Sequence, residues 1–143
     1  HCLDQAEGRE RPESEEEITA LLLCRSPVTD AGLRELAALP NLTWLNLSDT
    51  QVTDAGLECR RGLPRLQTLH LGGTQVTDAG LEHLEGLTEI QGLRLAKTSV
   101  TDAGLVHLRG LTKLKWLNVG DTQVTDVGIR ELHKALPKVD ITR

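Results

Sequence analysis

The chain has 143 residues, 38% of them hydrophobic and 26% charged, which is typical of a single folded domain. Apolar runs such as residues 21–24 are far shorter than the ~20 residues of a membrane-spanning helix, so direct insertion into a membrane is excluded. The net charge of −5 comes from residues 1–17. Residues 18–143 have equal numbers of acids and bases and no basic stripe, which argues against binding through nucleic-acid phosphates.

The first segment, residues 1–17, is polar and acidic, so we expect a flexible lead-in outside the core. It begins with Cys2 followed by acidic residues, which resembles the start of a mature bacterial lipoprotein and leaves a cell-envelope tether open. The three cysteines, Cys2, Cys24 and Cys59, are irregularly spaced, which predicts free thiols and favours a cytoplasmic location.

From residue 18 onward the chain repeats every 24 residues, with Ser or Thr at the ninth position of each block and then Thr-Asp-Ala-Gly-Leu or a close variant. Such a period, kept over five blocks, indicates a solenoid. We therefore expect a repeat domain over residues 18–143, with five repeats and a terminal partial repeat. The blocks begin at Ile18, Leu42, Leu66, Ile90 and Leu114, and the partial repeat begins at Val139 after one extra residue.

Within one block the apolar spacing changes from two to three. Leu45 and Leu47 alternate as in a short strand with one buried face, whereas Leu81, Leu84 and Leu87 recur as on one side of a helix. The Thr or Asp before Ala-Gly-Leu is expected to cap the helix, and the ninth-position hydroxyl to bond the turn of the adjacent coil. Because strands stack ~4.8 Å apart and helices ~10 Å apart, the stack is expected to curve with its strands inside.

The pattern Leu-x-x-Leu-x-Leu-x-x-Thr resembles the leucine-rich repeat, and the Val-Thr-Asp-Ala-Gly-Leu half is similar to bacterial relatives of the cysteine-containing subclass. Ser or Thr stands at the ninth position, where the family usually has Asn or Cys. The resemblance covers residues 18–143 and implies an α/β solenoid, a curved horseshoe with a concave parallel β-sheet and convex short helices. It also implies binding to other proteins.

The concave side chains between the strand leucines vary while the frame does not, as an interaction surface requires. Trp44 and Trp116 fall in one column, ~14 Å apart, with Thr68 and Gly92 between them. This arrangement predicts a shallow anchor pocket with two aromatic walls. The alternative is that each Trp lies flat on its neighbours and shields the sheet. The predicted partner-binding residues are Trp44, Asn46, Asp49, His70, Arg94, Lys97, Trp116, Asn118 and Asp121.

Catalytic and metal sites receive little support from the sequence. Cys24, His70 and Asp49 are the residue types of a nucleophile, base and orienter, but Cys24 lies two strands, ~10 Å, from His70. A row of metal-ligand types recurs on the helical face, where neighbouring helices lie too far apart for two of its members to share one zinc ion. We therefore expect a non-enzymatic chain with no cofactor and no metal. The row consists of Glu35, Cys59, His83, His107 and Glu131.

The sequence thus favours a protein-binding scaffold that uses its concave sheet. The alternative is a non-catalytic regulatory or spacer domain of a larger, possibly membrane-tethered protein. The first strand, at residues 21–23, has no obvious polar cap before it, and solenoid ends need covering. We therefore expect this N-terminal end to be covered by a preceding segment, a partner or a second copy of the chain, which makes self-association possible there.

One charged residue interrupts the predicted core. The nineteenth position of each block is Leu, except in the second block, where it is Arg60. A buried unpaired guanidinium costs several kcal/mol, so we expect the helix of this block to wind irregularly. Arg60 is then expected to be exposed and Cys59, one place earlier, to be largely buried.

Overall fold

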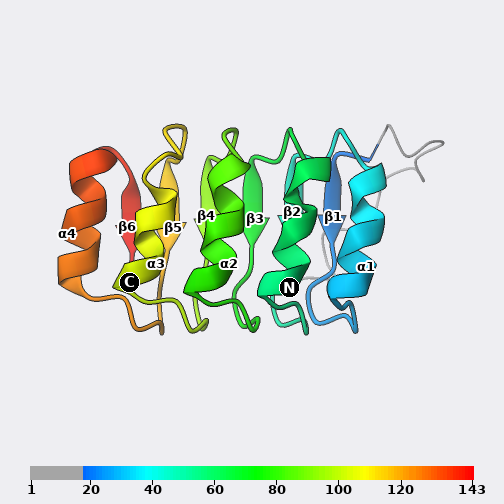
Figure 1. The fold of residues 1–143 in the computed structure, drawn as a ribbon, viewed down its shortest axis with the longest axis horizontal. Helices are drawn as coiled ribbons and strands as arrows, with labels where there is room; N and C mark the ends of the chain where they lie inside the picture. Colours follow the sequence, from blue (N-terminus) through cyan, green and yellow to red (C-terminus); the bar gives the residue numbers. More distant parts are fainter. Residues whose placement is uncertain (1–17) are drawn as a thin grey trace.

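The computed structural model describes residues 18–143, which form a row of stacked coils with a sheet on one side and short helices on the other (Figure 1). The acidic segment and Cys2 lie outside the described residues, so the flexible lead-in, the lipoprotein resemblance and the division of the chain stay predictions. No helix among residues 18–143 has the length and apolar character needed to cross a bilayer.

A single sheet of six parallel strands joins all the coils, and its spatial order follows the sequence. Each strand pairs with the next at an offset of 24 residues, so that Leu45 lies opposite Leu69 and Leu69 opposite Leu93. The extra residue before Val139 leaves this offset unchanged, since Leu117 lies opposite Ile141. The strands are β1 (Ala20–Leu22), β2 (Trp44–Asn46), β3 (Thr68–His70), β4 (Gly92–Arg94), β5 (Trp116–Asn118) and β6 (Asp140–Thr142).

The helical segments all lie on one face of this sheet (Figure 1). Most begin as an α-helix of one or two turns and tighten into a 3-10 helix, while the second block is 3-10 throughout. This matches the irregular winding expected where Arg60 interrupts the leucine column; the Arg60 side chain itself lies outside the described part of the structure. The segments are α1 (Asp30–Glu35), η2 (Leu36–Ala38), η3 (Asp54–Gly62), α2 (Asp78–Glu82), η4 (His83–Gly86), α3 (Asp102–Leu105), η5 (Val106–Leu108) and α4 (Asp126–Ala135).

The core lies between the sheet and the helices. The strand leucine Leu93 and the helix leucines Leu81 and Leu84 are at most 1% exposed, as the two apolar spacings predicted. At the first coil, by contrast, Leu21 and Leu23 are only partly buried, as at the end of a stack. The predicted α/β solenoid, with one parallel sheet and short helices, is confirmed, whereas self-association at the N-terminal end stays a prediction.

The turn after each strand is closed within its own coil. The ninth-position hydroxyl donates to the carbonyl three residues earlier, as in Thr74 Oγ1 to Leu71 O at 2.6 Å. The expected bond to the adjacent coil is therefore wrong. The contact between coils is made by the backbone instead: the eighth-position N–H donates to the next coil, as in Lys97 N to Gly120 O at 2.9 Å. The eighth residue of each block also has a positive φ, and these residues are Arg25, Asp49, Gly73, Lys97 and Asp121.

The Thr-Asp-Ala-Gly segment links each coil to the one before it. Thr77 caps α2 by accepting from the backbone of Ala79. Asp54, which the capping interpretation placed on its own helix, instead accepts from Thr77 of the following coil, from its N–H at 2.7 Å and its hydroxyl at 2.6 Å. The carboxylate packs so closely against Gly80 that a methyl group there would overlap Asp54 Oδ1. We call this arrangement the Asp–Thr–Gly ladder; it recurs at Asp30, Asp78 and Asp102 with the threonine and glycine of the following coil.

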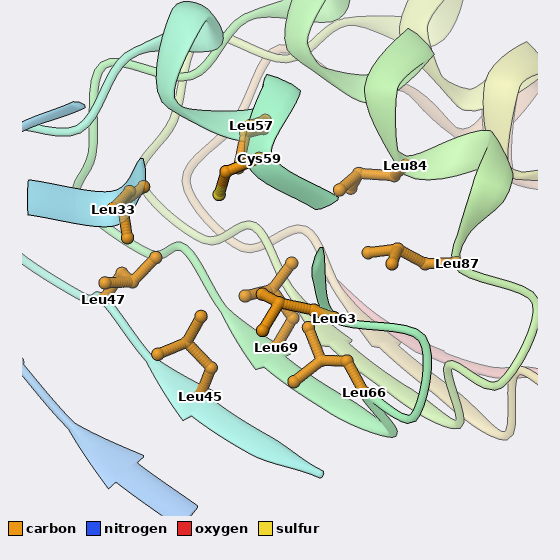
Figure 2. A pocket seen from close by; sticks show the side chains of 10 residues that line it. All are labelled: Leu33, Leu45, Leu47, Leu57, Cys59, Leu63, Leu66, Leu69, Leu84 and Leu87. Carbon is orange, nitrogen blue, oxygen red and sulfur yellow. The ribbon is translucent and has the colours of Figure 1, made fainter. Parts of the chain in front are cut away.

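A small apolar cavity of about 20 Å³ lies in the core beside η3. Figure 2 shows Cys59 on η3 pointing into it, opposite Leu45 and Leu69 of the strands. This inward direction agrees with the prediction, but Cys59 is only partly buried against the core rather than largely buried. The thiol is too small to fill the space that the missing nineteenth-position leucine leaves, and a cavity remains.

Candidate functional site

The strand register brings most of the predicted site residues to the face of the sheet opposite the helices, which we call the open face. Trp44, Thr68, Gly92 and Trp116 lie opposite one another along one row. The same register aligns a second row two residues further along each strand, and the buried leucines between the two rows point to the helices. The second row comprises Asn46, His70, Arg94 and Asn118.

The two indoles are joined through a histidine. The His70 ring centroid lies 5.6 Å from Trp44 and 5.8 Å from Trp116, and both pairs meet edge to face, with interplanar angles of 68° and 75°. Edge-to-face packing at this separation is favourable because a ring edge is positive and a ring face negative. We call Trp44, His70 and Trp116 the aromatic row.

Gly92 allows this row to form. A Cβ atom at Gly92 would overlap Nε1 and the six-membered ring of Trp116. The Trp116 indole therefore occupies the place of the missing side chain on β4 and reaches towards His70. The expected open pocket between two aromatic walls is wrong, since its floor at Gly92 is covered. The alternative, in which the Trp side chains lie on their neighbours, describes this surface better.

The position of His70 between the indoles affects its protonation. Partial burial lowers the pKa of His70 below the usual 6.5, and the positive charge of Arg94 on the neighbouring strand lowers it further. The imidazole is therefore neutral near pH 7, and the aromatic row presents an uncharged surface.

Asn46 and Asn118 have structural roles at the ends of their strands. The Asn46 Oδ1 atom accepts from the Ser48 N–H at 3.0 Å, and the Asn118 Oδ1 atom accepts from the Gly120 N–H at the same distance. Asn46 is only 7% exposed. Each amide satisfies backbone at the point where the chain leaves the sheet, which the sequence analysis did not anticipate, and this leaves Asn46 little surface for a partner.

A polar hollow of about 190 Å³ opens where strands β2 to β4 end, and we call it the loop hollow. It is lined by Arg25 and by four of the predicted site residues, which are Asn46, Asp49, Arg94 and Lys97. Arg25 Nε lies 3.7 Å from the Asp49 carboxylate. The predicted residue Asp121, which is exposed, occupies the equivalent turn three coils from Asp49 and does not line the hollow.

The comparisons with known proteins bear on this repeat architecture. A leucine-rich repeat family profile that spans two copies matches residues 40–86, and a single-repeat profile matches residues 110–132. An internalin from Listeria monocytogenes superposes over 89% of the chain with a TM-score of 0.75 and 26% sequence identity. The chain is a leucine-rich repeat protein of the bacterial type.

A second leucine-rich repeat protein, from Leptospira interrogans, shares the fold over 90% of this chain with a TM-score of 0.62 and 22% identity. The chain spans 35% of the internalin and 38% of the Leptospira protein. No curated protein sequence matches it. The leucine-rich repeat fold and these neighbours indicate a protein-interaction module; the cysteine-containing subclass stays a prediction.

Leucine-rich repeat proteins are typically non-enzymatic, and the geometry offers no support for the catalytic triad considered above. Cys24 is disulfide-bonded, so the prediction of three free thiols is wrong for this residue and its sulfur is no free nucleophile. Cys59 is a free thiol. Among residues 18–143 no group of three metal-ligand side chains is close enough to hold an ion. In the row of ligand types, His107 instead contacts Glu85, with 2.6 Å between Nδ1 and Oε1.

Proposed function

We propose that this leucine-rich repeat domain binds a protein partner on the open face of its sheet, with the aromatic row at the centre of the contact. Trp44, His70 and Trp116 are each partly exposed there and hold one another in place. A rigid, partly exposed aromatic cluster loses little conformational entropy on binding, and Trp is among the residues most enriched at the centres of interfaces.

The observation that carries this proposal is the aromatic composition of the chain. Trp44 and Trp116 are its only Trp residues, it has no Phe or Tyr, and both indoles meet over one histidine on the open face. The hydrophobic core is built from aliphatic side chains and does not need them. Arg94, Lys97, Asp49, Asn118 and Asp121 supply polar groups around the row, as the rim of an interface does.

The test replaces both indoles, Trp44→Ala with Trp116→Ala, and compares proteins crosslinked to the variant and to the unchanged chain in extract from the source cells. For a partner so identified, calorimetry should show binding weakened by at least ~2 kcal/mol, about 30-fold. The matched control is Val106→Ala with Val127→Ala, because these residues are 50% and 56% exposed on the helical side. Unchanged affinity in the Trp variant, or an equal loss in the Val variant, contradicts the proposal.

A further inference from the structure

The loop hollow owes its opening to two consecutive glycines. At the seventh and eighth positions the third block has Gly72 and Gly73, whereas every other block has a side chain in at least one of them. A Cβ atom at Gly72 would lie 3.4 Å from Arg94 Nε, and one at Gly73 would overlap the Asp49 carboxylate. Gly73 also has a φ of +70°, which favours glycine. The third coil therefore leaves room where the others place side chains.

The charges around this opening do not cancel. Arg25 and Asp49 face each other across the first side of the loop hollow. Arg94 and Lys97 lie on the other side, both are exposed, and in the described part of the chain neither forms an ion pair. The four side chains sum to a charge of +2, although residues 18–143 are neutral as a whole.

Two of the backbone N–H groups around the loop hollow already have partners. The Asp49 N–H donates to Gly72 O at 2.8 Å and the Gly73 N–H donates to Ala96 O at 2.9 Å. The positive charge in the hollow belongs to side chains, and the planar Arg94 guanidinium fits a carboxylate with two parallel hydrogen bonds. The Asp49 carboxylate on the opposite rim repels a doubly charged phosphate more strongly than a singly charged carboxylate.

We propose that the loop hollow receives a Glu or Asp side chain from an acidic segment of the protein partner, held between Arg94 and Lys97. The inference rests on the proposed binding at the open face and adds the chemistry of the bound segment. The hollow is adjacent to the aromatic row, because Arg94, which lines the hollow, lies opposite His70 on the neighbouring strand. One bound segment can thus place apolar contacts on the indoles and a carboxylate in the hollow.

The test needs no identified partner. The full chain, labelled with ¹⁵N, is titrated at low salt with acetyl-tetraglutamate amide and, separately, with acetyl-tetraglutamine amide. The glutamate peptide should shift the amide signals of Gly72, Gly73 and Lys97 in a saturable way, and the glutamine peptide should leave them unchanged. Inorganic phosphate is added in a third arm. Equal shifts with glutamine, or phosphate binding more tightly than the glutamate peptide, would overturn the inference.

Two double variants with the same change in charge locate the binding. Arg94→Gln with Lys97→Gln should lower the affinity for the glutamate peptide about tenfold, which is the size expected for two exposed charge pairs. Arg130→Gln with Lys134→Gln, on α4, should leave the affinity for the glutamate peptide within twofold of that of the unchanged chain. Equal weakening in both variants would mean that the peptide senses only net charge, which overturns the inference. If the glutamate peptide does not bind the hollow while the Trp variant still binds the protein partner more weakly, only this inference fails and the open face remains the binding surface.

Discussion

Gly80→Ala is the sharpest test of how the coils are joined, because two physical effects give it opposite signs. Alanine is about 1 kcal/mol better than glycine inside a helix, so helix propensity alone predicts a more stable protein. The structure predicts the reverse. The added methyl group would overlap Asp54 Oδ1, the atom that accepts from the Thr77 N–H at 2.7 Å.

The size of the effect follows from what must move. Making room for the methyl group displaces the Asp54 carboxylate and weakens its two hydrogen bonds to Thr77. A hydrogen bond to a charged group contributes about 1.5–3 kcal/mol, and the partial exposure of Asp54 reduces this. After the gain in helix propensity is subtracted, we expect Gly80→Ala to lower the free energy of unfolding by about 2 kcal/mol, measured by urea denaturation followed by circular dichroism.

Two controls separate the ladder from a general intolerance of alanine. Gly110→Ala should be neutral within about 0.5 kcal/mol, because nothing lies within 4 Å of a Cβ atom there. In the Asp54→Ala background the overlap is gone, so Gly80→Ala should cost at least ~1 kcal/mol less than in the unchanged chain. A Gly80→Ala protein as stable as the original, or an equal cost in both backgrounds, would refute the reasoning.

Three further predictions follow from the turns, the cavity and the ladder. Lys97 has a φ of +58°, so Lys97→Gly should raise the free energy of unfolding by about 1 kcal/mol while Lys97→Ala does not; urea denaturation that ranks Ala with Gly would contradict this. Burial raises the pKa of the Cys59 thiol, so its modification by a thiol reagent at pH 8, followed by mass spectrometry, should be at least ~10-fold slower in the folded than in the unfolded chain, and equal rates would refute its inward position. The hydrogen bonds from Thr125 lower the pKa of Asp102 below its usual 3.8, so the unfolded chain takes up the proton first and the protein loses stability as the pH drops through and below that value. Asp102→Asn should make the urea midpoint fall less between pH 5 and pH 3. A fall as large as in the unchanged chain would contradict this prediction.

The fold could be predicted from the sequence because one apolar pattern recurs five times. Leu45 and Leu81 are buried for the reasons that their spacing gave. The bonds between coils could not be read in the same way, because periodicity shows that Asp54 and Thr77 recur but not which coil each one contacts. The offset of 23 residues between them crosses from one coil to the next, and only the stacking brings the two side chains together.

The site was predicted less completely than the fold. The pattern placed Trp44 and Trp116 in one row, which the register confirms. It did not predict that Trp116 lies over Gly92, because a side-chain direction depends on the space that its neighbours leave. The pair Gly72 and Gly73 was visible in the sequence as a departure from the other blocks, and that signal could have indicated the loop hollow.

The constant offset between strands also bears on how such a chain changes length. Every strand pairs with a strand 24 residues away in the sequence. Every Asp–Thr–Gly contact joins the Asp of one coil to the Thr and Gly of the following coil. A duplicated unit of 24 residues would therefore form with both neighbouring coils the same strand pairing and the same Asp–Thr–Gly contacts that those coils already form. Gene duplication or deletion in whole units can lengthen or shorten the open face while the remaining residues keep their contacts, whereas a single added residue keeps the strand register only where a coil can absorb it, as the fifth block does before Val139.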